Sequence, residues 1–347
     1  MSAGKVLLAM SGGVDSSTAA VLLKQQGYEV DGVTLKLWGG ETDSGCCSLA
    51  DVEDARRVAS QLSIPHYVFN LGEEFTKYVV EPYVKAHTQM LTPNPCIECN
   101  RHIKFAGLHD RAMAMGYDYV ATGHHARVEK RNGFYRLIRG ADEKKDQSYV
   151  LSMVSQEVLS QTLLPVGDLT KEQVRKIAAD NNLRTASKAE SMDVCFIEKK
   201  GRESFLRDRI ELHAGEIVDV NGNRVGKHEG AELLTIGQRR GAGTAVADQA
   251  GNKQYVIERD PETFQVKVGT RDDLMVSSAE LRQISTTRPI DFPCKVQVQP
   301  RAHGMSFEAT WETAEKLLFD EPQMRIAPGQ TAACYIDDEC VGSGIAI

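Results

Sequence analysis

Short apolar runs alternate with helical patterns through the first 140 residues of the chain. The apolar run 5–10 ends at Ser11-Gly12-Gly13, as expected of a buried strand before a tight turn. Residues 16–26 then carry apolar side chains at helical spacing. The alternation predicts further strands over 30–38, 66–71 and 117–122, and further helices over 51–62, 73–87 (interrupted at Pro82) and 100–115. Strands separated by helices of about ten or more residues predict a parallel, doubly wound sheet.

The pattern changes in the second half of the chain. Residues 141–200 are predicted to be mostly helical, and the clearest helix covers 169–181 with Thr170 as its N-cap. After about residue 205, short β-rich runs alternate with turn signals such as Asn-Gly and Asp-Pro. Strands are predicted over 216–220, 254–258, 264–268, 295–299, 306–311 and 332–336. We therefore expect an α/β domain over 1–204, a central β-rich domain over 205–277 and a β-barrel over 278–347.

Composition narrows the class of protein. The chain has 347 residues, 41% of them hydrophobic and 26% charged, which excludes collagen-like, low-complexity and wholly disordered chains. No apolar run approaches the roughly 18 residues of a membrane helix, and the N-terminal apolar stretch is too short for a signal peptide, so we expect a cytoplasmic protein. Eight cysteines are too sparse for a disulfide scaffold and are therefore either buried or chemically active. The adjacent Cys46 and Cys47 are expected to be buried.

The segment Ser11-Gly12-Gly13-Val14-Asp15-Ser16-Ser17 lies between a predicted strand and a predicted helix. Its two glycines allow the backbone to approach an anion closely, and the amides of the first helical turn point toward such a ligand. Ser16 and Ser17 offer hydroxyl donors, and Asp15 could orient them or help to hold Mg²⁺. A Walker A loop requires a Lys that this segment lacks, which argues against a kinase-like P-loop. The segment predicts a different kind of phosphate loop.

Three cysteines are candidates for chemistry. Cys99 stands at the predicted start of the helix 100–115, where the helix N-terminus favours a thiolate, and Cys96 precedes it by three residues. Cys195 lies far away in the sequence, and taken by itself it is as well explained as a buried, inert thiol. The Cys-x-x-Cys pair allows a redox dithiol, a zinc site that lacks an obvious fourth ligand, or, with Cys195, an iron–sulfur cluster with one open iron site.

Six segments together resemble bacterial tRNA-specific 2-thiouridylases (MnmA-type) of the PP-loop ATP pyrophosphatase superfamily. They follow one another in the order expected of that family and span nearly the whole chain. The segments are Ser-Gly-Gly-Val-Asp-Ser-Ser at 11–17, Thr-Pro-Asn-Pro-Cys-Ile-Glu-Cys-Asn-Arg-His-Ile-Lys-Phe at 92–105, Ala-Thr-Gly-His at 121–124, Lys-Asp-Gln-Ser-Tyr at 145–149, Cys-Phe-Ile at 195–197 and Thr-Ile-Gly-Gln-Arg at 235–239. Several of them are long and rare, so chance agreement is a poor explanation.

The resemblance implies an adenine nucleotide α-hydrolase-like domain that adenylates the C2 oxygen of the wobble uridine (position 34) of tRNA. Sulfur then arrives as a persulfide on Cys195, supplied by a donor or relay protein, with Cys99 as the partner nucleophile. The products are 2-thiouridine, AMP and pyrophosphate. The positions that match those for ATP with Mg²⁺ are Ala9, Met10, Ser11, Gly12, Gly13, Val14, Asp15, Ser16, Leu35 and Gly123.

The resemblance also assigns contacts with tRNA. Asn94, Pro95 and Cys96 match the segment that meets the target base, and the other matching positions are His124, Lys145, Asp146, Gln147 and Gln330. Without the resemblance, Leu35 reads as a core residue, Lys145 and Asp146 as a solvated loop, and Gln330 as a turn residue.

The chain departs from the family pattern at two places. Many members have Asp where this chain has Cys96, which strengthens an alternative route in which Cys96, Cys99 and Cys195 hold an iron–sulfur cluster, such as [4Fe-4S], that activates sulfide. An Arg-Tyr pair of the C-terminal domain is replaced by Gln299-Pro300, which leaves a phosphate contact there in doubt.

Two other functions compete with tRNA thiolation. Another PP-loop ligase acting on a small molecule would not need Cys99 and Cys195, and a redox-sensing module would not need the ATP loop. The net charge of −7 argues mildly against nucleic-acid binding, but residues 100–145 carry ten basic and five acidic side chains. Because a phosphate backbone responds to the field within about 8–10 Å, we expect modest, salt-sensitive tRNA binding at one basic face.

Overall fold

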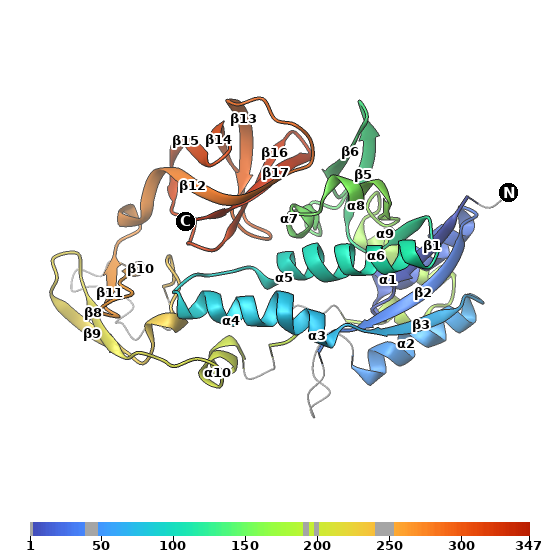
Figure 1. The fold of residues 1–347 in the computed structure, drawn as a ribbon, viewed down its shortest axis with the longest axis horizontal. Helices are drawn as coiled ribbons and strands as arrows, with labels where there is room; N and C mark the ends of the chain where they lie inside the picture. Colours follow the sequence, from blue (N-terminus) through green and yellow to red (C-terminus); the bar gives the residue numbers. More distant parts are fainter. Residues whose placement is uncertain (1–2, 39–47, 190–193, 198–200, 240–252) are drawn as a thin grey trace.

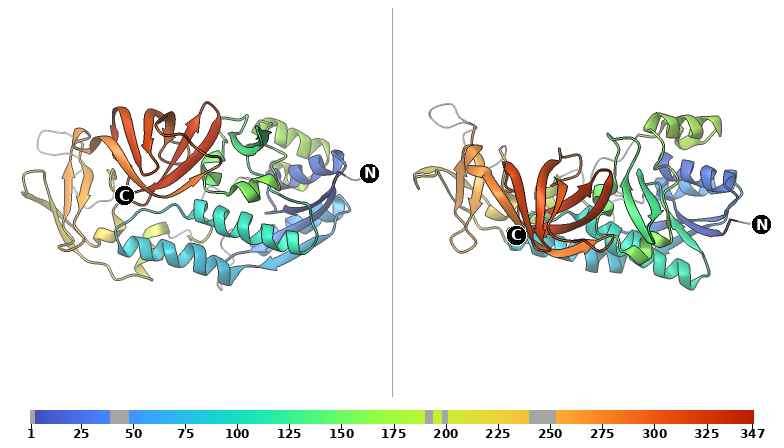
Figure 2. Two further views of the ribbon diagram at one scale, coloured as in Figure 1. Left: turned by 45° about the horizontal axis from the view of Figure 1, so that its top comes forward. Right: turned by 90° about the horizontal axis from the view of Figure 1, so that it is seen from above.

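The computed structural model describes residues 3–38, 48–189, 194–197, 201–239 and 253–347. The α/β part lies at one end of an elongated molecule and the central β-rich part at the other (Figure 1). The C-terminal barrel lies over the two long helices that run between these ends, and two further views show the same arrangement (Figure 2). Cys46 and Cys47 lie outside the described residues.

Five parallel strands form the sheet of the α/β part, in the order β3-β2-β1-β4-β7. The strands are β1 Lys5–Ala9, β2 Glu29–Lys36, β3 His66–Asn70, β4 Tyr119–Ala121 and β7 Thr162–Leu163. One apolar cluster packs a face of the sheet on α1 Val14–Gln25, α2 Leu49–Gln61 and α9 Lys171–Asp180, and a second cluster joins the other face to the helices of 72–114. Helices on both faces confirm the predicted doubly wound fold.

The predicted helix 73–87 is observed as three consecutive helical segments. They are α3 Gly72–Phe75, the π-helical turn η1 Thr76–Val80 and α4 Glu81–Thr88. The irregularity predicted from Pro82 occurs one turn before that residue. Proline has no N–H to donate to the preceding turn, so the helix widens there.

The second long helix begins earlier than the sequence predicts. It comprises α5 Pro95–Glu98, the π-helical segment η2 Cys99–Gly107 and α6 Leu108–Ala114. Asn94 is the N-cap, and its side chain accepts a hydrogen bond of 3.1 Å from the Cys96 amide, while Pro95 takes the first helical position that proline favours. The predicted start at residue 100 is therefore wrong: Cys99 lies one turn inside the helix, and Cys96 occupies the first turn.

A hairpin follows β4 where the sequence predicts no strand. It consists of β5 Ala126–Arg131 and β6 Phe134–Arg139, whose many charged residues hide the alternation of a half-buried strand. The short helical segments α7 Ser148–Leu151, α8 Gln156–Ser160 and η3 Arg184–Ser187 and the helix α9 fill the region predicted to be mostly helical. Thr170 caps α9 as predicted, in a capping box with Gln173.

The central part has four strands in the order β10-β11-β8-β9. They are β8 Gly215–Val218, β9 Arg224–His228, β10 Tyr255–Arg259 and β11 Val266–Gly269. The helix α10 Gly201–Arg207 precedes them, and the short turns η4 Ala231–Leu233 and η5 Asp272–Leu274 complete the region. The predicted boundaries at 204/205 and 277/278 thus lie within α10 and at the start of the long strand β12.

The C-terminal barrel is present as predicted, and six strands close it where the sequence predicts three. They are β12 Met275–Thr286, β13 Cys294–Gln299, β14 Phe307–Thr313, β15 Lys316–Met324, β16 Thr331–Ile336 and β17 Glu339–Ala346. The barrel closes because β12 pairs with both β15 and β17, and the fully buried Trp311 fills its interior. β17 also pairs with β6, so the unpredicted hairpin extends the barrel sheet. Within the described ranges, no helix has the length and apolar character needed to span a membrane.

Candidate active site

The predicted phosphate loop leaves β1 at its carboxyl end and leads directly into α1. Gly12 has a left-handed φ of 71°, and a Cβ there would lie 2.3 Å from the carbonyl oxygen of Asp51, so only glycine fits. Gly13 is the N-cap of α1 and provides no side chain to cap the amides of the first turn. Uncapped amides at the start of a 12-residue helix suit an anion held beside the loop.

The hydroxyls of Ser16 and Ser17 both form hydrogen bonds within the protein. The Ser16 hydroxyl lies 3.4 Å from that of Ser11 and accepts a hydrogen bond of 3.2 Å from the Ser11 amide, so it belongs to the loop. The Ser17 hydroxyl donates to the Gly13 carbonyl at 2.8 Å, and the residue is fully buried. The Ser16 hydroxyl also donates to the Gly13 carbonyl, at 3.2 Å, so both hydroxyls stabilise the first turn of α1.

Asp15 is fixed by two basic side chains that the sequence did not indicate. Lys171, the first residue of α9, donates to both carboxylate oxygens at 2.8 Å, and His125 Nε2 lies 3.1 Å from Oδ1. Burial raises the pKa of Asp15, but the hydrogen bonds from His125 and Lys171 outweigh it and hold the pKa below its usual value. A carboxylate already neutralised in this way favours the orienting role over the metal-binding one.

Gly123 and Leu35 lie at the carboxyl ends of the strands on either side of β1. A Cβ on Gly123 would lie 2.6 Å from the Ser16 amide nitrogen and 2.7 Å from the Asp15 carbonyl carbon, so the loop after β4 packs directly on the phosphate loop. Leu35 on β2 is 6% exposed and packs into the apolar cluster on one face of the sheet. Gly123 thus borders the predicted nucleotide site, whereas the packing of Leu35 agrees with its reading as a core residue.

The structure brings Cys99 and Cys195 to one apolar cluster. Cys99 is 5% exposed and belongs to the cluster that also contains Leu35, and the partly buried Cys195 packs against the same cluster. Cys96, one turn before Cys99, is exposed. Both predicted catalytic thiols therefore pack on the face of the sheet opposite α1, in a cluster that also includes Ala9 at the end of β1, and Cys96 is exposed.

Phe196, the neighbour of Cys195, is the centre of an aromatic socket. Its ring lies 5.2 Å from Phe205, 5.4 Å from Tyr83, 5.7 Å from Phe75 and 6.3 Å from Trp38, measured between ring centroids. The residue is 2% exposed. Such tilted and edge-to-face contacts stabilise beyond the burial of area alone. The socket fixes the position of the backbone that carries Cys195.

The three predicted cluster ligands do not fit an iron–sulfur cluster in this conformation. Among the described residues, which include all three cysteines, no group of three His, Cys, Asp or Glu side chains is arranged to hold a metal ion. Cys96 faces solvent while Cys99 is enclosed in the apolar cluster, so the two thiols have different surroundings. Three converging thiolates would be the minimum for such a cluster.

Of the residues matched to the target base, Asn94 and Pro95 form the start of the helix that carries Cys99. His124, in the loop after β4, has its Nδ1 2.7 Å from the Thr122 hydroxyl and its ring 5.7 Å from that of Phe105. Burial, aided by the nearby charge of Lys104, lowers the pKa of His124 to about 3. His124 is therefore a neutral side chain near pH 7, and any contact with RNA would be an uncharged one.

The other predicted tRNA contacts already have partners inside the protein. The Asp146 carboxylate accepts hydrogen bonds from Arg139, Ser148 and the Gly140 amide, and its side chain is 7% exposed. Gln147 accepts from the His125 amide at 2.8 Å. Gln330 donates to the Thr92 carbonyl at 2.6 Å and so ties the barrel to the loop before Asn94. These three side chains shape the site, and Lys145 beside them is partly exposed.

Ion pairs reduce the positive field expected of residues 100–145. Arg111 pairs with Glu74 at 2.5 Å, Arg127 with Asp338 at 3.0 Å and Arg136 with Glu339 at 2.6 Å, all with acidic partners from outside the segment. Arg139 joins Asp146 to Gln299 of the barrel, at 3.0 and 2.8 Å. Gln299, 5% exposed, thus connects the hairpin to the barrel rather than offering a phosphate contact.

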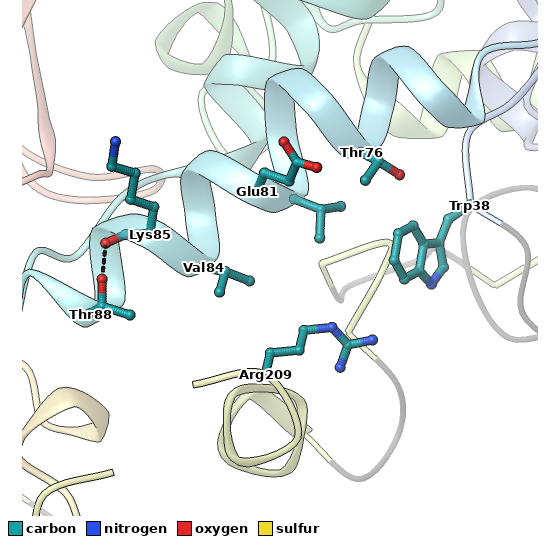
Figure 3. Close-up of a pocket in the computed structure, with 8 residues that line it drawn as sticks. Trp38, Thr76, Glu81, Val84, Lys85, Thr88 and Arg209 are labelled. Carbon is teal, nitrogen blue, oxygen red and sulfur yellow. Dashed lines mark hydrogen bonds between the residues drawn. The ribbon is translucent and has the colours of Figure 1, made fainter. Parts of the chain in front are cut away.

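An open groove lies between α4 and the segment after α10, and it shares Trp38 with the aromatic socket (Figure 3). Trp38, which contacts Phe196, stands at one end, and Arg209 faces α4 across it. Thr88 closes the other end with a hydrogen bond to the Lys85 carbonyl at 2.7 Å. The lining residues are Trp38, Thr76, Val80, Glu81, Val84, Lys85, Thr88 and Arg209, and they include none of the predicted site residues.

Family models match the chain from end to end. The model for the tRNA methyl transferase HUP domain covers residues 4–199, that for the tRNA methyl transferase PRC-barrel domain covers 203–270, and that for an aminomethyltransferase beta-barrel domain covers 257–346. Among solved structures, the U34-tRNA thiolase NcsA from Methanococcus maripaludis with its [4Fe-4S] cluster covers 56% of this chain and 61% of its own, at 17% identity and a TM-score of 0.37. That likeness is too slight to indicate what this chain binds.

Curated relatives are much more similar. The tRNA-specific 2-thiouridylase MnmA of Carboxydothermus hydrogenoformans is 43% identical over 98% of this chain and 96% of its own length. That of Moorella thermoacetica is 44% identical over 97% of this chain and 98% of its own length. Identity of this extent over nearly the full length of both proteins, together with the matched domain models, shows that the chain belongs to the tRNA-specific 2-thiouridylase family.

Proposed function

We propose that the chain is an ATP-dependent tRNA-uridine 2-sulfurtransferase that converts the wobble uridine of tRNA to 2-thiouridine. The observation that carries the proposal is the packing of Cys99 and Cys195 in one apolar cluster, which also includes Ala9, the last residue of β1 before the phosphate loop. The proposed reaction needs the phosphate loop, which serves adenylation, close to the two thiols, which serve sulfur transfer. Membership of the family supplies the substrate class.

In the first step, the phosphate loop holds ATP with Mg²⁺ through the amides that start α1. The C2 oxygen of uridine attacks the α-phosphorus, the bond to the β-phosphate breaks, and pyrophosphate leaves. Adenylation makes the C2 oxygen part of an AMP group, which is a much better leaving group than the oxygen alone. Lys171 and His125 keep Asp15 ionised and oriented beside the loop.

In the second step, the terminal sulfur of a Cys195 persulfide attacks C2, and AMP leaves with the oxygen. The Cys99 thiolate then attacks the Cys195 sulfur, which releases 2-thiouridine and leaves a Cys99–Cys195 disulfide for an external thiol to reduce. The partly buried Cys195 and the enclosed Cys99 suit this exchange, because an apolar surrounding keeps water from the reactive sulfur. A persulfide-bearing protein is the proposed donor.

The direct test is a reaction of ATP, polysulfide and unmodified tRNA with the wild-type protein and with Cys195→Ala. We expect 2-thiouridine from the wild type and none above background from the variant, because the nucleophilic sulfur has lost its carrier. Nucleoside analysis by mass spectrometry measures the product. Cys294→Ala is the matched control, since Cys294 has similar exposure but lies in the barrel. Absence of product from the wild type, or undiminished product from Cys195→Ala, would contradict the proposal.

The iron–sulfur route makes a different prediction. Because Cys96, Cys99 and Cys195 do not converge as metal ligands in the described structure, we expect anaerobically purified protein without iron to retain full activity. Iron and sulfide analysis alongside the thiolation assay checks this. Activity that rises in proportion to bound iron and is lost in Cys96→Ser would favour the cluster instead.

A further inference from the structure

Lys188 stands at a junction between the phosphate loop and the segment that carries Cys195. It lies seven residues before Cys195 in the sequence. Its ammonium donates to Asp51 Oδ1 and Asp54 Oδ2, both at 2.7 Å, and to the carbonyl oxygen of Gly12 at 3.0 Å. An ammonium has three N–H donors, so all three of its hydrogen bonds are used at this junction.

The two aspartates are themselves fixed against the phosphate loop. Asp51 completes the capping box of α2 by accepting from the Ser48 amide at 3.3 Å, and it also accepts from the Ser48 hydroxyl at 2.8 Å. Its carbonyl oxygen lies where a Cβ of Gly12 would stand, so the start of α2 and the phosphate loop touch backbone to backbone. Burial by itself lowers the pKa of Lys188, but the hydrogen bonds to Asp51 and Asp54 outweigh burial and hold the pKa above its usual value. The ammonium therefore remains charged.

The backbone around Lys188 is held from a second side. Arg175 of α9 donates to the Ala186 carbonyl at 2.6 Å and to the Lys188 carbonyl at 3.2 Å. One turn earlier on the same helix, Lys171 binds Asp15 of the phosphate loop. The loop, α9, the 186–188 segment and α2 therefore form a closed ring of contacts, and Lys188 makes its last link.

We propose that Lys188 is a positioning residue that couples the phosphate loop to the segment carrying Cys195, so that sulfur arrives where the uridine is adenylated. The inference rests on the proposed thiolation activity and assigns one residue to the junction between its two steps. Phe196 in its aromatic socket fixes the chain on the far side of Cys195. Lys188 and Phe196 are thus both held by the protein, on either side of Cys195 in the sequence, and small displacements at a reacting centre cost large factors in rate.

The test separates adenylation from sulfur transfer in one reaction. Wild type, Lys188→Gln and Lys188→Arg are given ATP, polysulfide and unmodified tRNA, and the ratio of 2-thiouridine formed to pyrophosphate released is measured. We expect Lys188→Gln to lower this ratio at least about tenfold, because adenylated tRNA that receives no sulfur is hydrolysed. Lys188→Arg keeps the charge and is expected to recover part of the ratio. Lys176→Gln, an exposed lysine of α9, is the control.

A purely structural role would lower both products together and leave the ratio unchanged, and that result would overturn the proposal. Should Lys188→Gln fail to fold, Asp54→Asn removes one partner of the ammonium and leaves the lysine in place, with a smaller fall in the same ratio expected. An unchanged ratio in Asp54→Asn would then overturn it. Failure of the wild type to form 2-thiouridine would contradict the proposed function itself. That outcome is distinguishable because it is measured in the wild type and not in the variants.

Discussion

Gly123→Ala is expected to lower the rate of tRNA-dependent pyrophosphate release about 100-fold, the scale that a misplacement of about 1 Å causes at a reacting centre. The added Cβ would lie 2.6 Å from the Ser16 amide nitrogen, 2.7 Å from the Asp15 carbonyl carbon and 3.0 Å from the Ser16 Cα. All three atoms belong to the backbone of the first turn of α1, so no side chain can move aside. The amide that has to give way is one of those that would bind phosphate.

The effect should be specific to the nucleotide loop. Gly123 lies outside the left-handed region, so alanine meets no backbone strain there, and the whole effect comes from the contact. Gly72→Ala is a matched control, because its Cβ would meet ordinary contacts of 3.4 and 3.7 Å at the start of α3. We expect the control to keep full activity. Equal rates of pyrophosphate release in the two variants would show that the loop after β4 does not support the phosphate site.

The strands β1 to β4, the phosphate loop and the barrel are predictable because each has a local signature, whereas the hairpin β5–β6 has none. An apolar run followed by Ser11-Gly12-Gly13 is such a signature, and the observed strand β1 Lys5–Ala9 ends one residue before the expected limit. The helix that carries Cys99 was predicted five residues short. Asn94 and Pro95 are themselves a strong start signal, but the apolar pattern becomes regular only after Asn100.

The supporting residues of the site could not be found in the same way. Lys171 and Lys188 are ordinary lysines in sequence, and each acquires its role through partners far away in the chain, Asp15 in one case and Asp51 in the other. Gln299 and Asp146 meet across Arg139, which lies on a hairpin that pairs with the barrel only in the folded chain. Long-range pairing of this kind leaves no spacing pattern for a single sequence to reveal.

Acidification from pH 7.5 to pH 5 is expected to destabilise the α/β domain by about 4 kcal/mol through two histidines. Burial, with the nearby charge of Arg202, lowers the pKa of His87 to about 4, and burial lowers that of His124 to about 3. In the unfolded chain both titrate near 6.5. Below that value the unfolded state binds more protons, so the stabilisation present above pH 6.5 is lost as the pH falls.

Each histidine contributes about 2 kcal/mol of this loss at pH 5, since the unfolded side chain is then largely protonated and the folded one largely neutral. Urea unfolding of a Trp311→Phe variant, followed by the fluorescence of Trp38, reports on the α/β domain, because the chain has two tryptophans and Trp38 lies in that domain. His87→Gln cannot be protonated, so it should remove about half of the difference between the two pH values. Any loss of stability that the substitution itself causes is the same at both pH values, so it cancels when the two free energies of unfolding are subtracted.

The location of His87 makes the result informative beyond stability. His87 lies in the last turn of α4, 1% exposed, with its ring 4.7 Å from that of Tyr83, which in turn contacts Phe196 beside Cys195. A proton on His87 would therefore loosen the wall of the aromatic socket first. As the pH approaches about 4, the pKa of His87 in the folded protein, thiolation should fall more steeply than ATP-dependent pyrophosphate release, and His87→Gln should reduce that difference. Parallel decline of both activities in the wild type would show that acid acts on the whole domain at once.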